Sequence, residues 1–298
     1  MQPAPFVIPL QTIEDFVTKQ FEIQLWILRT DLNHPEISGN KLFKLKYNLE
    51  EAVQKRHNTL LTFGGAFSNH IAATAAAGKE FGFKTIGIIR GDEIFPLNPT
   101  LEFAKACGMQ LYYVSRDVYK NKEALYAYVN RAFGEGSFYL IPEGGANALG
   151  VKGCEEITGY ITEEVDVVCC PCGTGTTLAG IVMGLKENQS AIGFQVLKGE
   201  GYIKNEILKW LREEDVEDNR KWSIIEDYHF GGYARIKPEL VDFVDSFKNT
   251  HLVPLDYIYT GKMMFGIYDL MKKGFFKKGL KIAAVHTGGL QGNAGFGS

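Results

Sequence analysis

Short apolar runs alternate with helical patterns along almost the whole chain. The runs have the length and composition of buried strands, and we expect strands at 59–63, 84–90, 110–115, 138–142, 165–170, 191–197 and 280–285. Between them we expect helices at 45–53, 69–81, 98–107, 119–133, 202–212 and from about 175. This alternation predicts an α/β fold with open twisted parallel sheets and crossover helices on both faces.

Glycine-rich turns follow four of the expected strands. They are Gly64-Gly65, Gly144-Gly145, Gly173 to Gly175 and Gly288-Gly289. In open α/β sheets, ligands bind at the carboxyl ends of the strands. We therefore expect the four turns to line one cleft.

Composition and charge exclude several classes of protein. Of the 298 residues, 45% are hydrophobic and 22% are charged, which is ordinary for a globular protein and excludes a disordered chain. The net charge of −3 gives no basic surface for nucleic acid, and no apolar run is long enough for a membrane span. The first residues show no secretion signal, and an odd count of five cysteines fits a reducing compartment, so we expect a cytoplasmic protein.

The cysteines at 169, 170 and 172 do not form a convincing metal site. Cys169 and Cys170 are neighbours on an expected strand, so their side chains point to opposite faces. No second pair of cysteines or histidines stands at zinc spacing, and no H-E-x-x-H motif occurs. We interpret these cysteines as small buried hydrophobic residues and expect no metal.

The segment CGTGTTLAG, residues 172–180, is a candidate anion site. It connects an expected strand to an expected helix, where backbone N–H groups and threonine hydroxyls can bind a phosphate. It lacks the dinucleotide fingerprint and the lysine of a Walker loop. The alternative is a tight turn with threonine caps.

A lysine and three short motifs give further candidates. Lys41 lies in SGNKLFK, where the ordinary interpretation is a solvated residue at a helix start and the functional one is a Schiff-base lysine. Ser68 and Asn69, in GGAFSNH, follow a strand and a glycine pair and alone indicate only a helix cap. Tyr259, in DYIYTGK, and Thr287, in HTGGLQG, stand at further turns.

Together these motifs resemble the fold-type II pyridoxal-phosphate (PLP) enzymes, which have a tryptophan synthase β-like fold. Within that group they are similar to the 1-aminocyclopropane-1-carboxylate deaminase/D-cysteine desulfhydrase family. The matching segments, in order, are SGNKLFK, GGAFSNH, IPEGGANALG, GTGTT, DYIYTGK and HTGG, spanning residues 38–289. The resemblance implies PLP as cofactor, a small amino acid as substrate and a homodimer.

The resemblance also implies roles for single residues. Lys41 matches the lysine that holds PLP as a Schiff base, and Lys44 matches a basic residue near the cofactor phosphate. Ser68 matches the serine beside the substrate carboxylate, and Asn69 matches the contact to the phenolic oxygen of PLP. The phosphate cradle is matched by Thr174, Gly175, Thr176 and Thr177. The active-site tyrosines are matched by Tyr259 and, in GGYARIKPE, by Tyr233.

We expect two domains that share the cleft. The smaller is built from residues 51–147 and is inserted into a larger, PLP-binding domain formed by residues 1–50 and 148–298.

The chain departs from the family pattern near the substrate. Leu42-Phe43 replaces a usual Thr-Arg, Ala72 and Ala73 stand where an arginine is usual, and the loop before Lys41 is compressed.

Two threonines bear on which reaction is catalysed. The deaminase branch has glutamate at the position matching Thr260 and leucine at the position matching Thr287, whereas threonine at both resembles the desulfhydrase branch. A neutral hydroxyl facing the pyridine nitrogen leaves that nitrogen unprotonated and weakens the electron sink. A weak sink suffices to expel a thiolate, and opening a cyclopropane demands more.

The sequence therefore favours α,β-elimination from D-cysteine or a similar β-substituted amino acid, giving pyruvate, ammonia and sulfide. Lys41 is expected to remove the Cα proton, Ser68 to hold the carboxylate and Tyr259 to assist at the leaving group. The alternatives are a 1-aminocyclopropane-1-carboxylate deaminase that forms 2-oxobutanoate and ammonia, a PLP racemase or another lyase on this fold. A non-catalytic α/β protein that binds a phosphate ligand is a further alternative.

Overall fold

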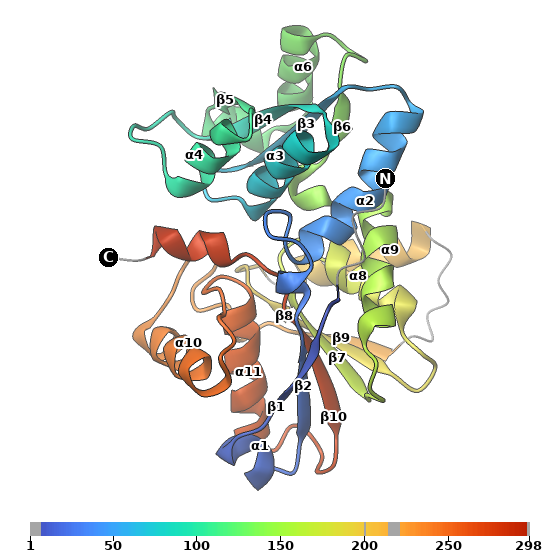
Figure 1. The fold of residues 1–298 in the computed structure, drawn as a ribbon, viewed down its shortest axis with the longest axis vertical. Helices are drawn as coiled ribbons and strands as arrows, with labels where there is room; N and C mark the ends of the chain where they lie inside the picture. The colour runs from blue at the N-terminus through green and yellow to red at the C-terminus, as the bar shows by residue number, and fades with distance from the viewer. Residues whose placement is uncertain (1–6, 200, 214–220, 297–298) are drawn as a thin grey trace.

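The computed structural model describes residues 7–199, 201–213 and 221–296, and the strands in this part of the chain form two sheets (Figure 1). The large sheet has the order β1-β2-β10-β7-β8-β9, and the small sheet has the order β5-β4-β3-β6. The strands of the large sheet are β1 (Leu10–Ile13), β2 (Gln24–Leu28), β7 (Val167–Cys172), β8 (Ser190–Gln195), β9 (Lys221–Ile225) and β10 (Lys281–Val285). Those of the small sheet are β3 (Thr59–Gly65), β4 (Lys84–Arg90), β5 (Gln110–Val114) and β6 (Tyr139–Ile141).

The predicted fold class is confirmed. The seven expected strands correspond to β3, β4, β5, β6, β7, β8 and β10, and each pairs with its neighbours in parallel. The prediction missed β1, β2 and β9. It also missed that β1 pairs antiparallel with β2, so that one edge of the large sheet departs from the parallel pattern.

Helices cover both faces of both sheets. On the large sheet, α8 (Thr176–Gly184) and α9 (Tyr202–Glu213) pack on one face, and α10 (Pro238–His251) and α11 (Thr260–Lys272) on the other (Figure 1). On the small sheet, α3 (Asn69–Phe81) and α4 (Pro99–Ala106) pack opposite α5 (Arg116–Lys120) and α6 (Lys122–Phe133). The short α1 (Phe16–Gln20) connects β1 to β2. None of the described helices is long and apolar enough to cross a lipid bilayer.

One of the predicted helices is two helices in the structure. The expected helix at 119–133 is divided at Asn121, which ends α5 and whose side chain accepts a hydrogen bond from the backbone N–H of Ala124. An asparagine cap satisfies a free N–H group of a new helix start and so favours a break at that residue.

The cysteines at 169, 170 and 172 are buried and unpaired, as expected of small hydrophobic residues.

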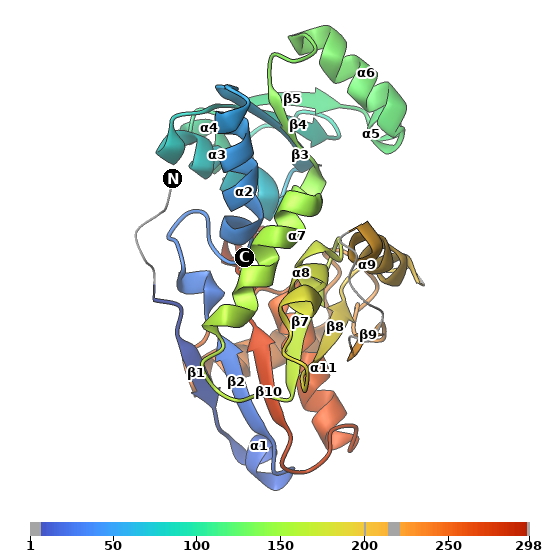
Figure 2. The same cartoon turned by 90° about the vertical axis from the view of Figure 1, so that its right-hand side faces the viewer.

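The two sheets are joined by a pair of helices that lie side by side, α2 (Asn40–Gln54) and α7 (Ala148–Glu155) (Figure 2). Phe43, in the first turn of α2, belongs to the core of the large sheet, whereas Leu45 and Leu49 belong to a core of the small sheet. The strands of the small sheet all lie within residues 51–147. The domain boundaries stay a prediction, because α2 packs against both sheets.

Gly153 makes the contact between α2 and α7 possible. A Cβ atom on Gly153 would lie 1.9 Å from the carbonyl oxygen of Phe43, and this atom belongs to the backbone of a packed helix. Backbone atoms cannot move away as a flexible side chain can. The position of α2, and with it that of its first turn, therefore depends on a missing side chain in α7.

We expect Gly153→Ala to lower the free energy of unfolding by about 1–3 kcal/mol, because the added methyl group overpacks the contact between α2 and α7. Gly159→Ala is the matched control, since a Cβ atom there would meet nothing within 4 Å. Its effect should stay within about 0.5 kcal/mol. Urea unfolding of both variants measures the difference, and equal stabilities would contradict this account of the helix pair.

Candidate active site

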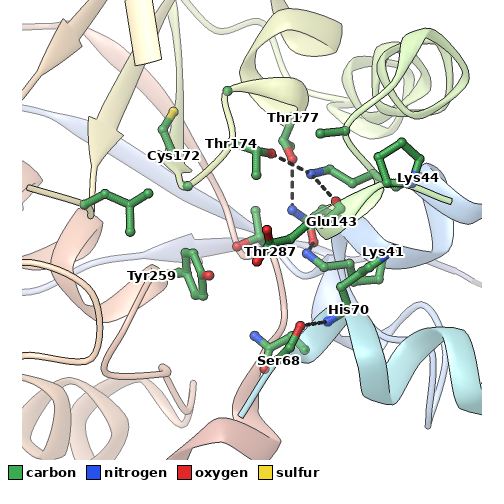
Figure 3. Close-up of a pocket in the computed structure, with 18 of the residues that line it drawn as sticks. Lys41, Lys44, Ser68, His70, Glu143, Cys172, Thr174, Thr177, Tyr259 and Thr287 are labelled. Carbon is green, nitrogen blue, oxygen red and sulfur yellow. Dashed lines mark hydrogen bonds between the residues drawn. The ribbon is translucent and has the colours of Figure 1, made fainter. Parts of the chain in front are cut away.

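A cavity of about 500 Å³ opens between the two sheets, at the carboxyl ends of β3, β4, β7 and β10 (Figure 3). It is lined by glycine from each of the four predicted turns, namely Gly65, Gly144, Gly173, Gly175 and Gly288. The structure therefore brings the turns together as the sequence predicts. The predicted site residues that line the cavity are Lys41, Lys44, Ser68, Asn69, Thr174, Gly175, Thr177, Tyr233, Tyr259 and Thr287. Thr176 is fully buried, and its hydroxyl lies 3.0 Å from that of Thr174.

The first turn of α2 is held against the end of β10. Gly39, the residue before α2, has a φ of +73°, and a Cβ atom there would lie 2.0 Å from the carbonyl oxygen of Thr287. The N–H of Asn40 donates to that same oxygen at 3.2 Å. Only glycine combines this backbone conformation with so close an approach.

Asn40 connects Lys41 to the threonine loop. The amine of Lys41 donates to Oδ1 of Asn40 at 2.8 Å, and Nδ2 of Asn40 donates to the hydroxyl of Thr177 at 2.9 Å. The Lys41 side chain is therefore oriented by a neighbour that is itself oriented by α8. Asn40 was not among the predicted site residues, although it lies next to Lys41 in the motif.

Lys44 places a buried cation beside the same loop. Its side chain is 3% exposed, and Nζ donates to the carbonyl oxygen of Gly144 at 3.1 Å and contacts the hydroxyl of Thr174 at 3.5 Å. Within the described chain, Lys44 forms no ion pair with a carboxylate. The loop leads into α8, whose first N–H groups are capped by no side chain. A buried cation beside an uncapped helix N-terminus forms a site for an anion.

The amine of Lys41 is held in an unusual electrostatic environment. Burial, and then the positive charge of Lys44, lower the pKa of Lys41 to about 7. His70, which the sequence analysis missed, lies buried in the same cavity with Nε2 2.9 Å from the hydroxyl of Thr62. Burial and the two lysines also lower the pKa of His70, so that its imidazole is neutral. Lys41 is thus an amine that loses its proton near neutral pH.

Ser68 and Asn69 begin α3 on the small-sheet side of the cavity. The hydroxyl of Ser68 accepts the N–H groups of His70 at 3.2 Å and Ile71 at 3.3 Å, so Ser68 is the predicted helix cap and also lines the cavity. Oδ1 of Asn69 accepts from the side chain of Gln291 at 2.7 Å, which orients the asparagine. A strand-end arginine, Arg90, faces the same side of the cavity.

Arg90 was not predicted, although its place as the last residue of a strand is a usable signal. Its backbone lies opposite Gly65 in the β3–β4 register. A Cβ atom on Gly65 would lie 3.2 Å from the Arg90 guanidinium, which also lies 5.4 Å from the ring centre of Tyr119. In the part of the chain that the structure describes, no carboxylate pairs with Arg90, and Glu143, which also lines the cavity, pairs with Lys122 at 3.6 Å.

The two tyrosines meet at the start of α11. Their ring centres lie 6.3 Å apart at an interplanar angle of 67°. Tyr259 precedes α11, and the buried carboxylate of Asp256 accepts the N–H groups of Ile258, Tyr259 and Thr260 at 3.0, 2.7 and 2.9 Å. Burial raises the pKa of Tyr259 well above its usual value, so the phenol keeps its proton.

Thr260 and Thr287 differ in what their hydroxyls do. The hydroxyl of Thr260 is fully buried, donates to Asp256 Oδ2 at 2.6 Å and accepts the N–H of Asp256 at 3.0 Å. The side chain of Thr287 lines the cavity, and within the described residues its hydroxyl has no hydrogen-bond partner. Of the two, Thr287 is the threonine that a ligand in the cavity can contact.

We expect Lys41 of the cofactor-free protein to react with acetic anhydride with a midpoint near pH 7, because its amine is neutral above that pH. Exposed lysines serve as the internal reference, since a solvated lysine has a pKa of about 10.4. Lys44→Gln should move the midpoint of Lys41 to higher pH, because it removes a neighbouring positive charge. Mass spectrometry across a pH series measures both, and a midpoint shared with the exposed lysines would refute the assignment.

Comparison with known proteins agrees with the interpretation of this cavity as a PLP site. A model of the family described as "Pyridoxal-phosphate dependent enzyme" matches residues 2–288. A Pyrococcus furiosus protein, named provisionally as a 1-aminocyclopropane-1-carboxylate deaminase, is 32% identical over 309 residues, which cover 98% of this chain and 92% of the relative.

Two further matches extend this. A mitochondrial protein of Arabidopsis thaliana, named as a bifunctional D-cysteine desulfhydrase/1-aminocyclopropane-1-carboxylate deaminase, is 32% identical and covers 90% of this chain and 73% of its own length. A solved structure described as an ACC deaminase homologue superimposes with a TM-score of 0.82 at 30% identity, over 97% of this chain and 91% of the other. The chain therefore belongs to the pyridoxal-phosphate dependent enzymes, in the 1-aminocyclopropane-1-carboxylate deaminase/D-cysteine desulfhydrase family.

Proposed function

We propose that this PLP-dependent lyase or deaminase eliminates the β-substituent of a small amino acid, D-cysteine foremost, and forms pyruvate, ammonia and sulfide. The family assignment supports the enzyme class and the cofactor. The names of the relatives include both D-cysteine desulfhydrase and 1-aminocyclopropane-1-carboxylate deaminase, so the choice between these reactions depends on this chain's own residues.

The residues of the cavity fit PLP. Lys44 is a buried cation without a carboxylate partner among the described residues, and it lies beside the uncapped N-terminus of α8 and the hydroxyl of Thr174, an arrangement suited to a phosphate. Lys41 offers an amine whose pKa is already lowered to about 7, as a covalent attachment site requires. When bound, PLP supplies the electron sink that stabilises the charge left at Cα of the substrate.

Other residues of the cavity are placed to act on different parts of the substrate. The hydroxyl of Ser68, at the N-terminus of α3, is placed to bind the α-carboxylate, and the guanidinium of Arg90 contributes positive charge on that side. Lys41 takes the proton from Cα, because its amine is neutral near pH 7. Tyr259 remains protonated and so can give its phenolic proton to the departing sulfur.

The observation that carries the choice of reaction is the hydroxyl of Thr287, which has no hydrogen-bond partner among the residues that the structure describes. Of the two branch-marking threonines, it is the one that lines the cavity, and it would bring no charge to the ring nitrogen of PLP if it faced that nitrogen. A neutral partner does not hold a proton on a basic nitrogen as a carboxylate does. This supports expulsion of a good leaving group such as a thiolate over opening of a carbon ring.

The resemblance supports a homodimer, and the odd number of cysteines supports a reducing compartment such as the cytoplasm; both belong to the proposal. Sedimentation velocity of the purified protein tests the first. The non-catalytic phosphate binder considered from the sequence disagrees with the family assignment, whose members are enzymes. A racemase or another lyase on this fold would keep the same cofactor residues, so the identity of the reaction products distinguishes these alternatives from the proposed elimination.

We expect Lys44→Gln to raise the Kd for PLP by at least about tenfold, because it removes a charged donor from the phosphate side of the cavity. Lys46→Gln is the control on the same helix. Lys46 is partly exposed and pairs with Glu156 at 2.7 Å, so its loss should change the Kd by less than about twofold. Equal effects in a fluorescence titration would show that the cation of Lys44 does not serve the phosphate.

We expect the wild-type enzyme to release pyruvate and sulfide from D-cysteine faster than it forms 2-oxobutanoate from 1-aminocyclopropane-1-carboxylate. Thr287→Leu should lower kcat/KM for D-cysteine by about tenfold or more, whereas Thr287→Ser, which keeps the hydroxyl, should stay within about threefold. Position 287 is tested alone because Glu at 260 would face the buried Asp256 carboxylate. A wild type that opens the cyclopropane faster overturns the proposed reaction.

A further inference from the structure

A second buried lysine lies just outside the groups that contact the substrate. Lys262 is 0% exposed and stands in the first turn of α11, three residues after Tyr259. Its Nζ donates to the carbonyl oxygens of His229 at 2.9 Å and Gly232 at 2.8 Å. Within the described residues it forms no ion pair, and burial lowers the pKa of Lys262 to about 8.

The two carbonyl groups belong to the loop that carries Tyr233. Four residues of this loop have positive φ, namely Phe230 at 54°, Gly231 at 99°, Gly232 at 120° and Ala234 at 54°. Residues other than glycine disfavour this region, so such a loop persists only where its surroundings hold it. Within the loop, the N–H of Gly232 donates to His229 O at 3.0 Å, and the N–H of Gly231 donates to Nδ1 of His229 at 2.9 Å. The N–H of Arg235 donates to Gly232 O at 3.2 Å, so these bonds close short turns inside the loop and none of them connects the loop to α11.

Lys262 connects this loop to α11. The ammonium group bridges the carbonyl of His229 and the carbonyl of Gly232, the residue directly before Tyr233. A charged donor to a carbonyl is stronger than a neutral hydrogen bond, above all in a buried site. The first turn of α11 therefore orients Tyr259 through its own backbone and reaches Tyr233 through Lys262.

We propose that Lys262 is a positioning residue that holds the loop at 229–234 so that Tyr233 stays against Tyr259 at the substrate side of the cavity. The inference rests on the proposed function only in that it takes the two tyrosines to face the substrate. The two lysine hydrogen bonds, the left-handed residues of the loop and the contact between the tyrosine rings carry it.

A double-mutant cycle on the holoenzyme tests whether Lys262 acts through Tyr233. Lys262→Met and Tyr233→Phe should each lower kcat/KM for the best amino-acid substrate by about tenfold. The kcat/KM of the double variant should lie within about twofold of that of the less active single variant, because the loss of Tyr233 adds little once Lys262 no longer positions it. Losses that multiply in the double variant would overturn the proposal.

Trypsin gives a readout that does not depend on activity. Arg235 follows the loop, so releasing the loop in Lys262→Met should speed cleavage after Arg235 by at least about fivefold, because proteolysis follows local opening. Lys272→Met, at the other end of the same helix, is the matched control and should cleave at the wild-type rate. Equal cleavage in wild type and Lys262→Met would refute the positioning role, even if no substrate is found.

Should Lys262→Met fail to fold, Lys262→Gln serves in both experiments. Its amide can donate to one of the two carbonyls, so it should fall between wild type and a complete loss of the connection in cleavage rate and in kcat/KM. The content of PLP and the melting temperature of each variant are measured alongside. A Lys262→Gln enzyme with wild-type cleavage and wild-type kcat/KM would overturn the proposal as well.

Discussion

The close approach of the first turn of α2 to the end of β10 is the constraint on which the rest of the site depends. Gly39 leaves room for the carbonyl of Thr287, and Asn40 binds that carbonyl through its N–H. The same turn then presents Lys41 and, one turn on, Lys44. One backbone contact therefore sets the distance between the reactive amine, the anion site and the hydroxyl of Thr287.

Buried positive charge without matching carboxylates is the second organising feature. An isolated buried ammonium is costly, and proteins retain one where it has strong acceptors or where a ligand supplies the charge. Lys262 has two carbonyl acceptors, whereas Lys44 has one carbonyl and a distant hydroxyl. Lys44 is thus the cation whose remaining hydrogen bonds a phosphate can accept. The acceptors of Lys262, in contrast, are supplied by the protein itself.

The fold class and most of the cavity lining could be predicted from sequence because both depend on local signals. Apolar runs bounded by glycine predict the central parallel strands, and parallel strands necessarily bring the turns at their carboxyl ends to one place. The strand β2 was missed because the turn before it is made by Glu22, with a φ of 55°, a residue that gives no turn signal. The edge strand β9 was missed because its side chains are only partly buried.

The rest of the site depends on contacts between distant segments. Arg90 reaches the cavity because β4 pairs with β3 beside a glycine, and His70 is buried where α3 packs against Thr62 of β3 and the turn at Gly145. The conformation around Tyr233 requires Phe230 and Ala234 in the left-handed region, which neither residue type favours. No local pattern announces these features, since the structure that imposes them is assembled from the whole chain.

The way the site is divided between the two sheets has a consequence for how such an enzyme can change over evolution. The groups suited to the cofactor phosphate, Lys44 and the Thr174 loop, belong to α2 and the large sheet, whereas Ser68 and Arg90 lie on the small-sheet side of the cavity. Substitutions at Ser68 or Arg90 can therefore change the surroundings of a ligand in the cavity while the groups suited to the phosphate stay unchanged. In such an arrangement, part of the substrate preference can change over evolution separately from cofactor binding.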